Sequence, residues 1–78
     1  MSRIRMRQVT STALAAVGYD AEHRWLDVEF RHGGLYRYLG VPPQIHDGLL
    51  SSPSKGSFFR ERIQDQYLVT ILRDSDRG

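Results

Sequence analysis

The sequence predicts a small α+β domain, in which an antiparallel meander of three to four strands is followed by two short helices and a possible C-terminal edge strand. Three observations lead to this prediction. Residues 25–30 alternate strictly between large and charged side chains, which is typical of a half-buried strand. Residues 31–34, Arg-His-Gly-Gly, form a tight turn into a second alternating segment, so the two strands are antiparallel. Pro42 and Pro43 then favour a helix start, because proline presets φ and the first helical turn does not use its missing N–H.

The composition predicts one soluble domain. The chain has 78 residues, of which 40% are apolar and 26% are charged. We expect a single domain over residues 1–78, with a basic N-terminal arm at 1–7 and a polar tail at 73–78. No apolar stretch approaches the roughly 20 residues that span a bilayer, and no signal-peptide pattern follows the first arginines. A cytoplasmic protein without membrane contact is therefore expected, and the absence of cysteine excludes disulfides, thiolate metal sites and a cysteine nucleophile.

The basic residues are unusual in kind and in place. Ten of the eleven are arginine, which favours planar, bidentate contacts with phosphate or carboxylate groups. Residues 1–19 carry a charge of +3, so residues 20–78 carry −1 of the total of +2. A basic arm of this kind can contact nucleic acid. It can also be a solvated terminus, which is the interpretation we favour.

The predicted meander has three strands in chain order. Residues 13–19 are expected to form the first, reaching the hairpin through a polar turn that begins at Asp20. In residues 25–30 Leu26, Val28 and Phe30 share the core face, whereas Asp27 and Glu29 share the other face and are expected to face water.

The strand predicted at residues 35–40 carries large groups on both faces. Tyr36 and Tyr38 lie on one side, and Leu35, Arg37 and Leu39 lie on the other. We expect the tyrosines to pack under the helices, because a sheet this small needs aromatic volume in its core. In the alternative arrangement the leucines are buried, and the tyrosines form an exposed aromatic platform with Trp25.

Each predicted helix has a recognisable start and buried face. The first helix begins at the two prolines, and the second begins after Ser54, whose hydroxyl is a plausible N-cap. Spacing of four residues marks the buried pairs, which are Ile45 with Leu49 and Phe59 with Ile63. Residues 67–72 then have high strand propensity and can pair with an open edge of the sheet.

The motifs that suggest chemistry do not predict an enzyme, a metal site or a small-molecule cofactor. Ser52 and Lys55 match a Ser-x-x-Lys spelling, but that chemistry needs a deep pocket, which a chain of this size does not provide. The order Lys-Gly-Ser at residues 55–57 lacks the upstream glycine of a phosphate loop. The histidines are widely separated and are expected to be polar surface residues; they are His23, His32 and His46.

Several segments together resemble the KTSC domain family over about residues 8–67. They are Thr10-Ser11, Val17-Gly18-Tyr19-Asp20, residues 26–30, Tyr36-Arg37-Tyr38, Gly40-Val41-Pro42 and residues 53–59. That family takes its name from a lysyl-tRNA synthetase C-terminal domain and also occurs as small free-standing bacterial and phage proteins. The resemblance implies RNA binding, mainly because the family's domain is attached to that synthetase. This chain departs from the family pattern at Arg60-Glu61-Arg62, where the acid weakens a phosphate-contacting face.

Two kinds of binding module follow from these residues. In the first, an RNA-binding accessory domain, Lys55, Ser57 and Arg37 contact phosphates at or near a helix start, while Trp25, Tyr36 and Tyr38 supply stacking surfaces. In the second, a protein partner or a second copy of the chain pairs with an exposed sheet edge and aromatic patch.

Overall fold

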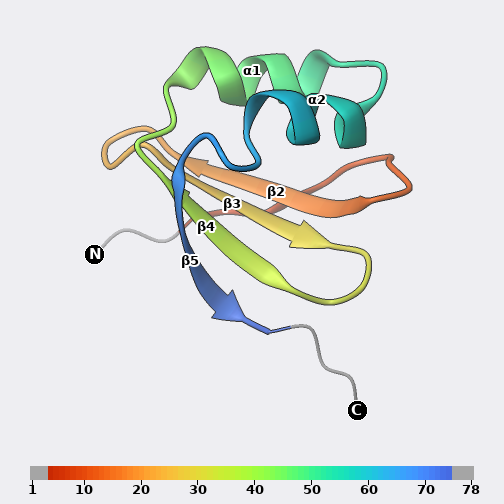
Figure 1. The fold of residues 1–78 in the computed structure, drawn as a ribbon, viewed down its shortest axis with the longest axis horizontal. Helices are drawn as coiled ribbons and strands as arrows, with labels where there is room; N and C mark the ends of the chain where they lie inside the picture. The colour runs from red at the N-terminus through yellow and green to blue at the C-terminus, as the bar shows by residue number, and fades with distance from the viewer. Residues whose placement is uncertain (1–3, 75–78) are drawn as a thin grey trace.

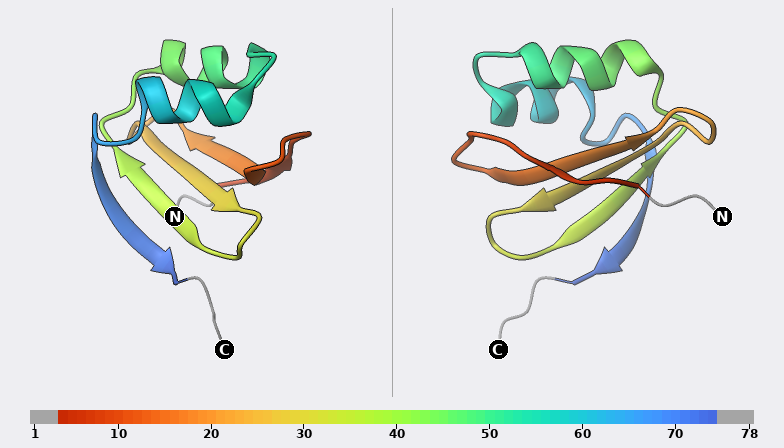
Figure 2. Two further views of the ribbon diagram at one scale, coloured as in Figure 1. Left: turned by 45° about the vertical axis from the view of Figure 1, so that its right-hand side comes forward. Right: turned by 180° about the vertical axis from the view of Figure 1, so that it is seen from behind.

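The computed structural model describes residues 4–74, which fold into one antiparallel sheet with two helices (Figure 1). The elements in chain order are β1 (Arg7–Gln8), β2 (Leu14–Asp20), β3 (Trp25–Phe30), β4 (Leu35–Leu39), α1 (Pro43–Ser51), α2 (Lys55–Arg62) and β5 (Leu68–Arg73). The strands lie in the order β1-β2-β3-β4-β5, so every strand pairs with its neighbour in sequence. Both helices cover the same face of the sheet (Figure 2). The predicted α+β class is confirmed, but the described sheet has five strands rather than three or four.

The strand that the sequence did not reveal is β1. Its two residues pair with β2 in the register Arg7↔Val17 and Gln8↔Ala16, which is too short a run for any alternation to show. The preceding residues lie against the sheet at Gly18, where a Cβ atom would come within 2.4 Å of the Ile4 Cγ2 atom. Part of the predicted basic arm is therefore packed on the sheet, while Arg3 lies outside the described residues.

The face of the sheet under the helices forms the core. The register pairs Val28 with Tyr36 and Leu26 with Tyr38, so these side chains share that face. Tyr38 is only 6% exposed, which confirms that the tyrosines pack inward. The pKa of Tyr38 is raised to about 12. Burial is the largest cause, and neighbouring Tyr36 and Asp65 raise the pKa further. The most buried side chains are Leu14, Val17, Leu26, Val28, Val41, Leu49 and Ile63.

The helix starts agree with the proline and serine signals, with one difference. Pro42 occupies the N-cap position of α1, and Ser54 occupies that of α2. The Ser54 hydroxyl, however, makes no capping hydrogen bond and instead donates to the Ser57 hydroxyl at 3.0 Å. The side-chain cap predicted for α2 is therefore wrong, and its first turn keeps backbone N–H groups without an intrahelical acceptor.

The outer face of the sheet corrects the prediction for Asp27. This residue is 4% exposed rather than solvated. It lies opposite Arg37 on the neighbouring strand, and the guanidinium donates to both carboxylate oxygens, at 2.8 and 3.0 Å. The same guanidinium lies 4.4 Å from the ring centroid of Trp25. A charged residue at a solvent-facing register position is thus buried by its cross-strand partner and a neighbouring indole.

The C-terminal strand pairs as expected. β5 runs antiparallel to β4, with Leu39 opposite Leu68 and Tyr36 opposite Ile71. Arg73, which was assigned to a polar tail, belongs to this strand and donates to the Glu29 carboxylate at 2.7 Å. The tail beyond Asp74 lies outside the described residues.

Helix α1 is held to the sheet through a histidine. The ring of His46 stacks on Tyr19 with centroids 4.6 Å apart, and the Tyr19 hydroxyl donates to the Val41 carbonyl. Burial lowers the pKa of His46, and nearby Arg7 lowers it further, while Asp47 partly opposes both effects. His46, which was expected to be a polar surface residue, is therefore a packing residue against Tyr19.

Replacing Arg37 with methionine should lower the free energy of unfolding of the domain. The change keeps an apolar stem over Trp25 but leaves the Asp27 carboxylate buried without its partner, which we expect to cost roughly 2–3 kcal/mol of unfolding free energy. Urea denaturation followed by tryptophan fluorescence measures this loss. Asp27→Asn, which retains an acceptor for Arg37, should cost less. An Arg37→Met variant as stable as the parent chain would contradict this account of the outer face.

Acidification should destabilise the domain through His46. Because the folded-state pKa lies below the unfolded value, the unfolded chain binds more protons as the pH falls through about 6.5. The contribution of neutral His46 to the free energy of unfolding is therefore fully present above that pH and is lost progressively below it. Melting temperatures between pH 7.5 and 5.5 should fall less steeply for His46→Phe, which keeps a ring against Tyr19 but cannot titrate. Equal slopes for the two proteins would show that His46 does not contribute.

Candidate nucleic-acid interface

A cleft of about 620 Å³ lies between the segment before β2 and the start of α2. One wall consists of residues 10–13, and the other consists of residues 53–57. Arg31 and Arg60 complete the lining. Segments far apart in the sequence therefore meet at this cleft, at the end of the sheet where β2 begins.

The wall before β2 is shaped by hydroxyl and guanidinium hydrogen bonds. The Ser11 hydroxyl accepts from the backbone N–H groups of Ala13 and Leu14, at 3.1 and 3.2 Å, and so closes a tight turn. Arg31 donates to the carbonyls of Ser11 and Val9, at 2.9 and 3.2 Å. A guanidinium has five N–H donors, so Arg31 can hold this wall and still contact a ligand.

The wall at the start of α2 is rich in donors. Lys55 donates through Nζ to the Ser52 carbonyl at 3.1 Å, which holds its ammonium group at the mouth of the helix. Ser57 accepts from Ser54 and, at 3.4 Å, from Arg60. Gly56 has no side chain, and a Cβ atom placed there would touch the Ala13 side chain at 3.4 Å. The two walls consequently approach each other closely at Gly56.

The charge of the cleft has one sign. Arg31, Lys55 and Arg60 all line it, and none of its described lining residues is acidic. The partial positive charge of the α2 N-terminus adds to these cations. The hydroxyls of Thr10, Ser11, Thr12, Ser54 and Ser57 supply further hydrogen-bonding groups around the same space. An anion with several oxygen atoms, such as a phosphate group, fits this arrangement.

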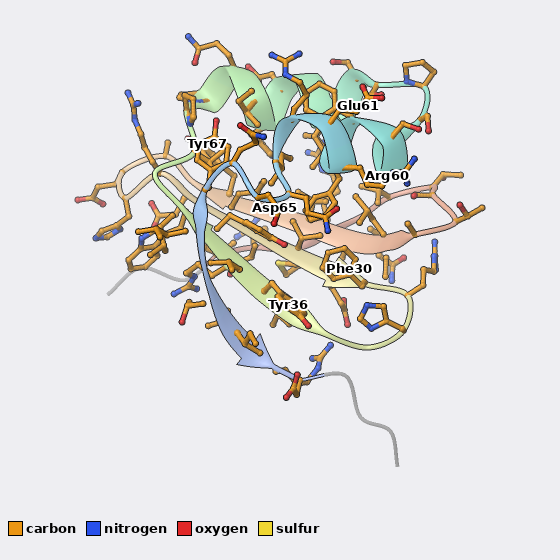
Figure 3. All side chains as sticks on the ribbon, in the orientation of Figure 1. Phe30, Tyr36, Arg60, Glu61, Asp65 and Tyr67 are labelled. Atoms are coloured by element: carbon orange, nitrogen blue, oxygen red, sulfur yellow. The ribbon has the colours of Figure 1, made fainter. Side chains whose placement is uncertain are left out.

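An aromatic depression of about 330 Å³ adjoins the cleft and shares Ala13, Gly56 and Arg60 with it. The depression is lined by Phe30, His32 and Tyr36 from the β3–β4 hairpin. The rings of Phe30 and His32 are stacked, with an interplanar angle of 3°, and Tyr36 meets Phe30 edge-on. Figure 3 shows Phe30 and Tyr36 on the helix side of the sheet, below Arg60 of α2. Arg60 thus lies between a cationic cleft and an aromatic surface.

The model of the KTSC domain matches residues 10–67 of this chain, which include both walls of the cleft and the aromatic hairpin. The chain belongs to the KTSC domain family. Its fold agrees with a crystal structure of a KTSC domain protein from Yersinia pestis, with a TM-score of 0.87 and 36% sequence identity over 90% of this chain and 99% of that one.

Two sequence relatives place this KTSC domain in context. An uncharacterised protein of Stutzerimonas stutzeri is 39% identical over 67 residues, which is 86% of this chain and 90% of that protein. A lysine–tRNA ligase of Nostoc punctiforme is 35% identical over 49 residues, which is 63% of this chain but only 9% of the ligase. The domain is therefore similar both to a small free-standing protein and to one segment of a synthetase.

The KTSC fold brings only some of the predicted binding residues together. Lys55 and Ser57 share the cleft, and Tyr36 lies in the neighbouring depression. Tyr38 also lines the depression but is almost fully buried against Phe59, with ring centroids 5.5 Å apart. Trp25 and Arg37 lie on the opposite face of the sheet, where Arg37 is already paired with Asp27. No single platform therefore unites the predicted residues.

The lining residues that were not predicted include three with a cationic or imidazole side chain, namely Arg31, His32 and Arg60. Arg31 and His32 follow β3 directly and were interpreted only as parts of a turn. Because Glu61 follows Arg60 directly, this side of α2 was expected to be a weaker phosphate-contacting face. Glu61, however, lines neither hollow. The helical angle between adjacent residues, about 100°, separates them and could have indicated this.

One group of possible metal ligands occurs among the described residues, namely Asp20, Glu22 and His23. The Asp20 carboxylate already accepts from the backbone N–H groups of Glu22 and His23 and lies 2.9 Å from the His23 ring. These contacts are those of a turn between β2 and β3. Over residues 4–74, no helix has the length and apolar character needed to cross a bilayer.

Proposed function

We propose that this KTSC domain is a non-catalytic module that binds single-stranded RNA. The observation that carries the proposal is the continuity between a cleft lined by three cations and an aromatic depression, joined through Arg60. A sugar-phosphate backbone presents an anionic group and a flat base side by side, so one nucleotide matches both hollows.

Each part of the proposed site has a separate role. Arg31, Lys55 and Arg60 contact phosphate oxygens, and the Ser57 hydroxyl supplies a further hydrogen bond. A base lies against His32 and Tyr36, whose rings are half-buried or exposed at the hairpin. Tyr38 packs on Phe59 in the core, and Phe59 in turn contacts Phe30. Trp25 and Arg37 lie on the opposite face of the sheet. The similarity of the domain to a segment of lysine–tRNA ligases supports RNA as the nucleic acid.

Binding of a fluorescein-labelled single-stranded RNA, measured by anisotropy, tests the proposal. Two or three phosphate contacts predict that affinity falls by about tenfold between about 50 and about 200 mM salt. Arg60→Ala should weaken binding by roughly five- to tenfold and reduce the salt dependence, because one phosphate contact is lost.

Arg62→Ala is the matched control, since it removes the same charge from the same helix. Arg62 lies over the Phe58 ring, at 5.5 Å, and does not line the cleft. Lys55→Ala should behave like Arg60→Ala. No detectable binding at about 50 mM salt, or equal losses in Arg60→Ala and Arg62→Ala, would refute a phosphate site at this cleft.

A further inference from the structure

The two edges of the sheet are built differently. The β1 edge has only two paired residues, Arg7 and Gln8, and both are polar. The β5 edge has six residues, with large apolar side chains that are 77% exposed at Leu68, 47% at Val69, 55% at Ile71 and 43% at Leu72. Soluble proteins usually protect an edge strand with charge, proline or short length. The β1 edge has such protection. In β5 the register shift at Leu72 and the charge of Arg73 are confined to the end of the strand, and residues 68–71 have none.

The exposed edge is held firmly in place. Arg73 fixes the end of β5 through the Glu29 carboxylate at 2.7 Å and the Gly33 carbonyl at 3.0 Å. At the other end, Tyr67 packs against the core immediately before the strand. Figures 1 and 2 show β5 extending away from the two helices, and all six of its residues are exposed. The strand is therefore already ordered for pairing, and a partner does not have to meet the cost of ordering it.

The sequence of β5 is complementary to itself when it runs antiparallel. The apolar pairs Leu68-Val69 and Ile71-Leu72 are arranged symmetrically about Thr70. A two-fold axis at Thr70 sets this residue opposite its own copy and Val69 opposite Ile71 of the partner subunit. Leu68 then lies beside Leu72 of the partner subunit, where β5 has a register shift. Residues 67–72 carry no charge, so this arrangement brings no like charges together within the pairing segment.

We propose that β5 pairs with β5 of a second copy of this chain, about a two-fold axis at Thr70, so that the two sheets become continuous. Antiparallel pairing of identical edges is closed by its symmetry, which gives a dimer rather than a filament. It also covers the exposed large apolar side chains of the described residues, all of which lie on β5. Strands β3 and β4 separate β5 from β2, where the cationic cleft begins, so the cleft of each copy stays open.

Sedimentation equilibrium of the intact chain tests the proposal, because a 9.0 kDa monomer and a dimer of twice that mass are easily distinguished. Over about 5 to about 500 µM we expect a reversible dimer, because an interface made by one pair of strands is small and should be weak. Ile71→Lys places a charge in the pairing segment and should raise the dimer dissociation constant at least about tenfold. Gln44→Lys adds the same charge to the exposed surface of α1 and should leave the constant unchanged. Circular dichroism checks that both variants are folded.

A cysteine cross-link tests the position of the axis without adding a charge. The chain has no cysteine, so Thr70→Cys supplies a single thiol. Residues directly opposite in antiparallel strands have Cα atoms about 4.5 or 5.5 Å apart, within the range that a disulfide spans. Oxidised glutathione should therefore convert Thr70→Cys to a disulfide-linked dimer much faster than Gln44→Cys.

Three results would overturn the proposal. One is a monomer at every concentration together with equal cross-linking of the two cysteine variants. Another is a dimer whose dissociation constant Ile71→Lys leaves unchanged. The third is a dimer that Ile71→Lys disrupts but in which Thr70→Cys does not cross-link, because this would place the axis away from Thr70.

Discussion

The structure depends on a sheet that has helices on only one of its faces. The inner face is closed by α1 and α2, so the outer face needs another means of excluding water from its centre. The Asp27 carboxylate, the Arg37 guanidinium and the Trp25 indole meet this need across β3 and β4. Because the bidentate pair joins residues directly opposite each other, it also fixes the register of the two strands. That register in turn places Tyr36 and Tyr38 under the helices.

The arrangement of the candidate site follows from this register. With the tyrosines inside, the aromatic groups that lie next to the cleft are those of the β3–β4 hairpin, namely Phe30, His32 and Tyr36. Helix α2 crosses the same region and brings Arg60 over them. The cations and the rings therefore meet at the rim of the core. Arg37 does not join this site, because it lies on the outer face of the sheet and is paired with Asp27 there.

The sequence was informative wherever one face of an element is buried. Alternation located β3 and β4, proline and serine located the helix starts, and Phe59 with Ile63 marked the buried side of α2. It was uninformative for β1, whose two residues are too few to show a period. It was misleading for Asp27, since alternation says which residues share a face but not whether a partner strand covers them. The cleft could not be predicted either, because Arg31 and the segment before β2 meet α2, which carries Lys55 and Arg60, only through tertiary contacts.

The division of charge over the molecule connects the two proposed surfaces. Arginines at the cleft have carbonyl and hydroxyl partners, which hold a guanidinium without neutralising it. By contrast, Arg37 and Arg73 on the outer face pair with Asp27 and Glu29, which removes net charge from that face. The neutralised region adjoins β5, whose central residues are uncharged and apolar. An uncharged edge suits strand pairing, and an unneutralised cleft suits phosphate, so one small sheet can hold the two surfaces at opposite sides without electrostatic conflict.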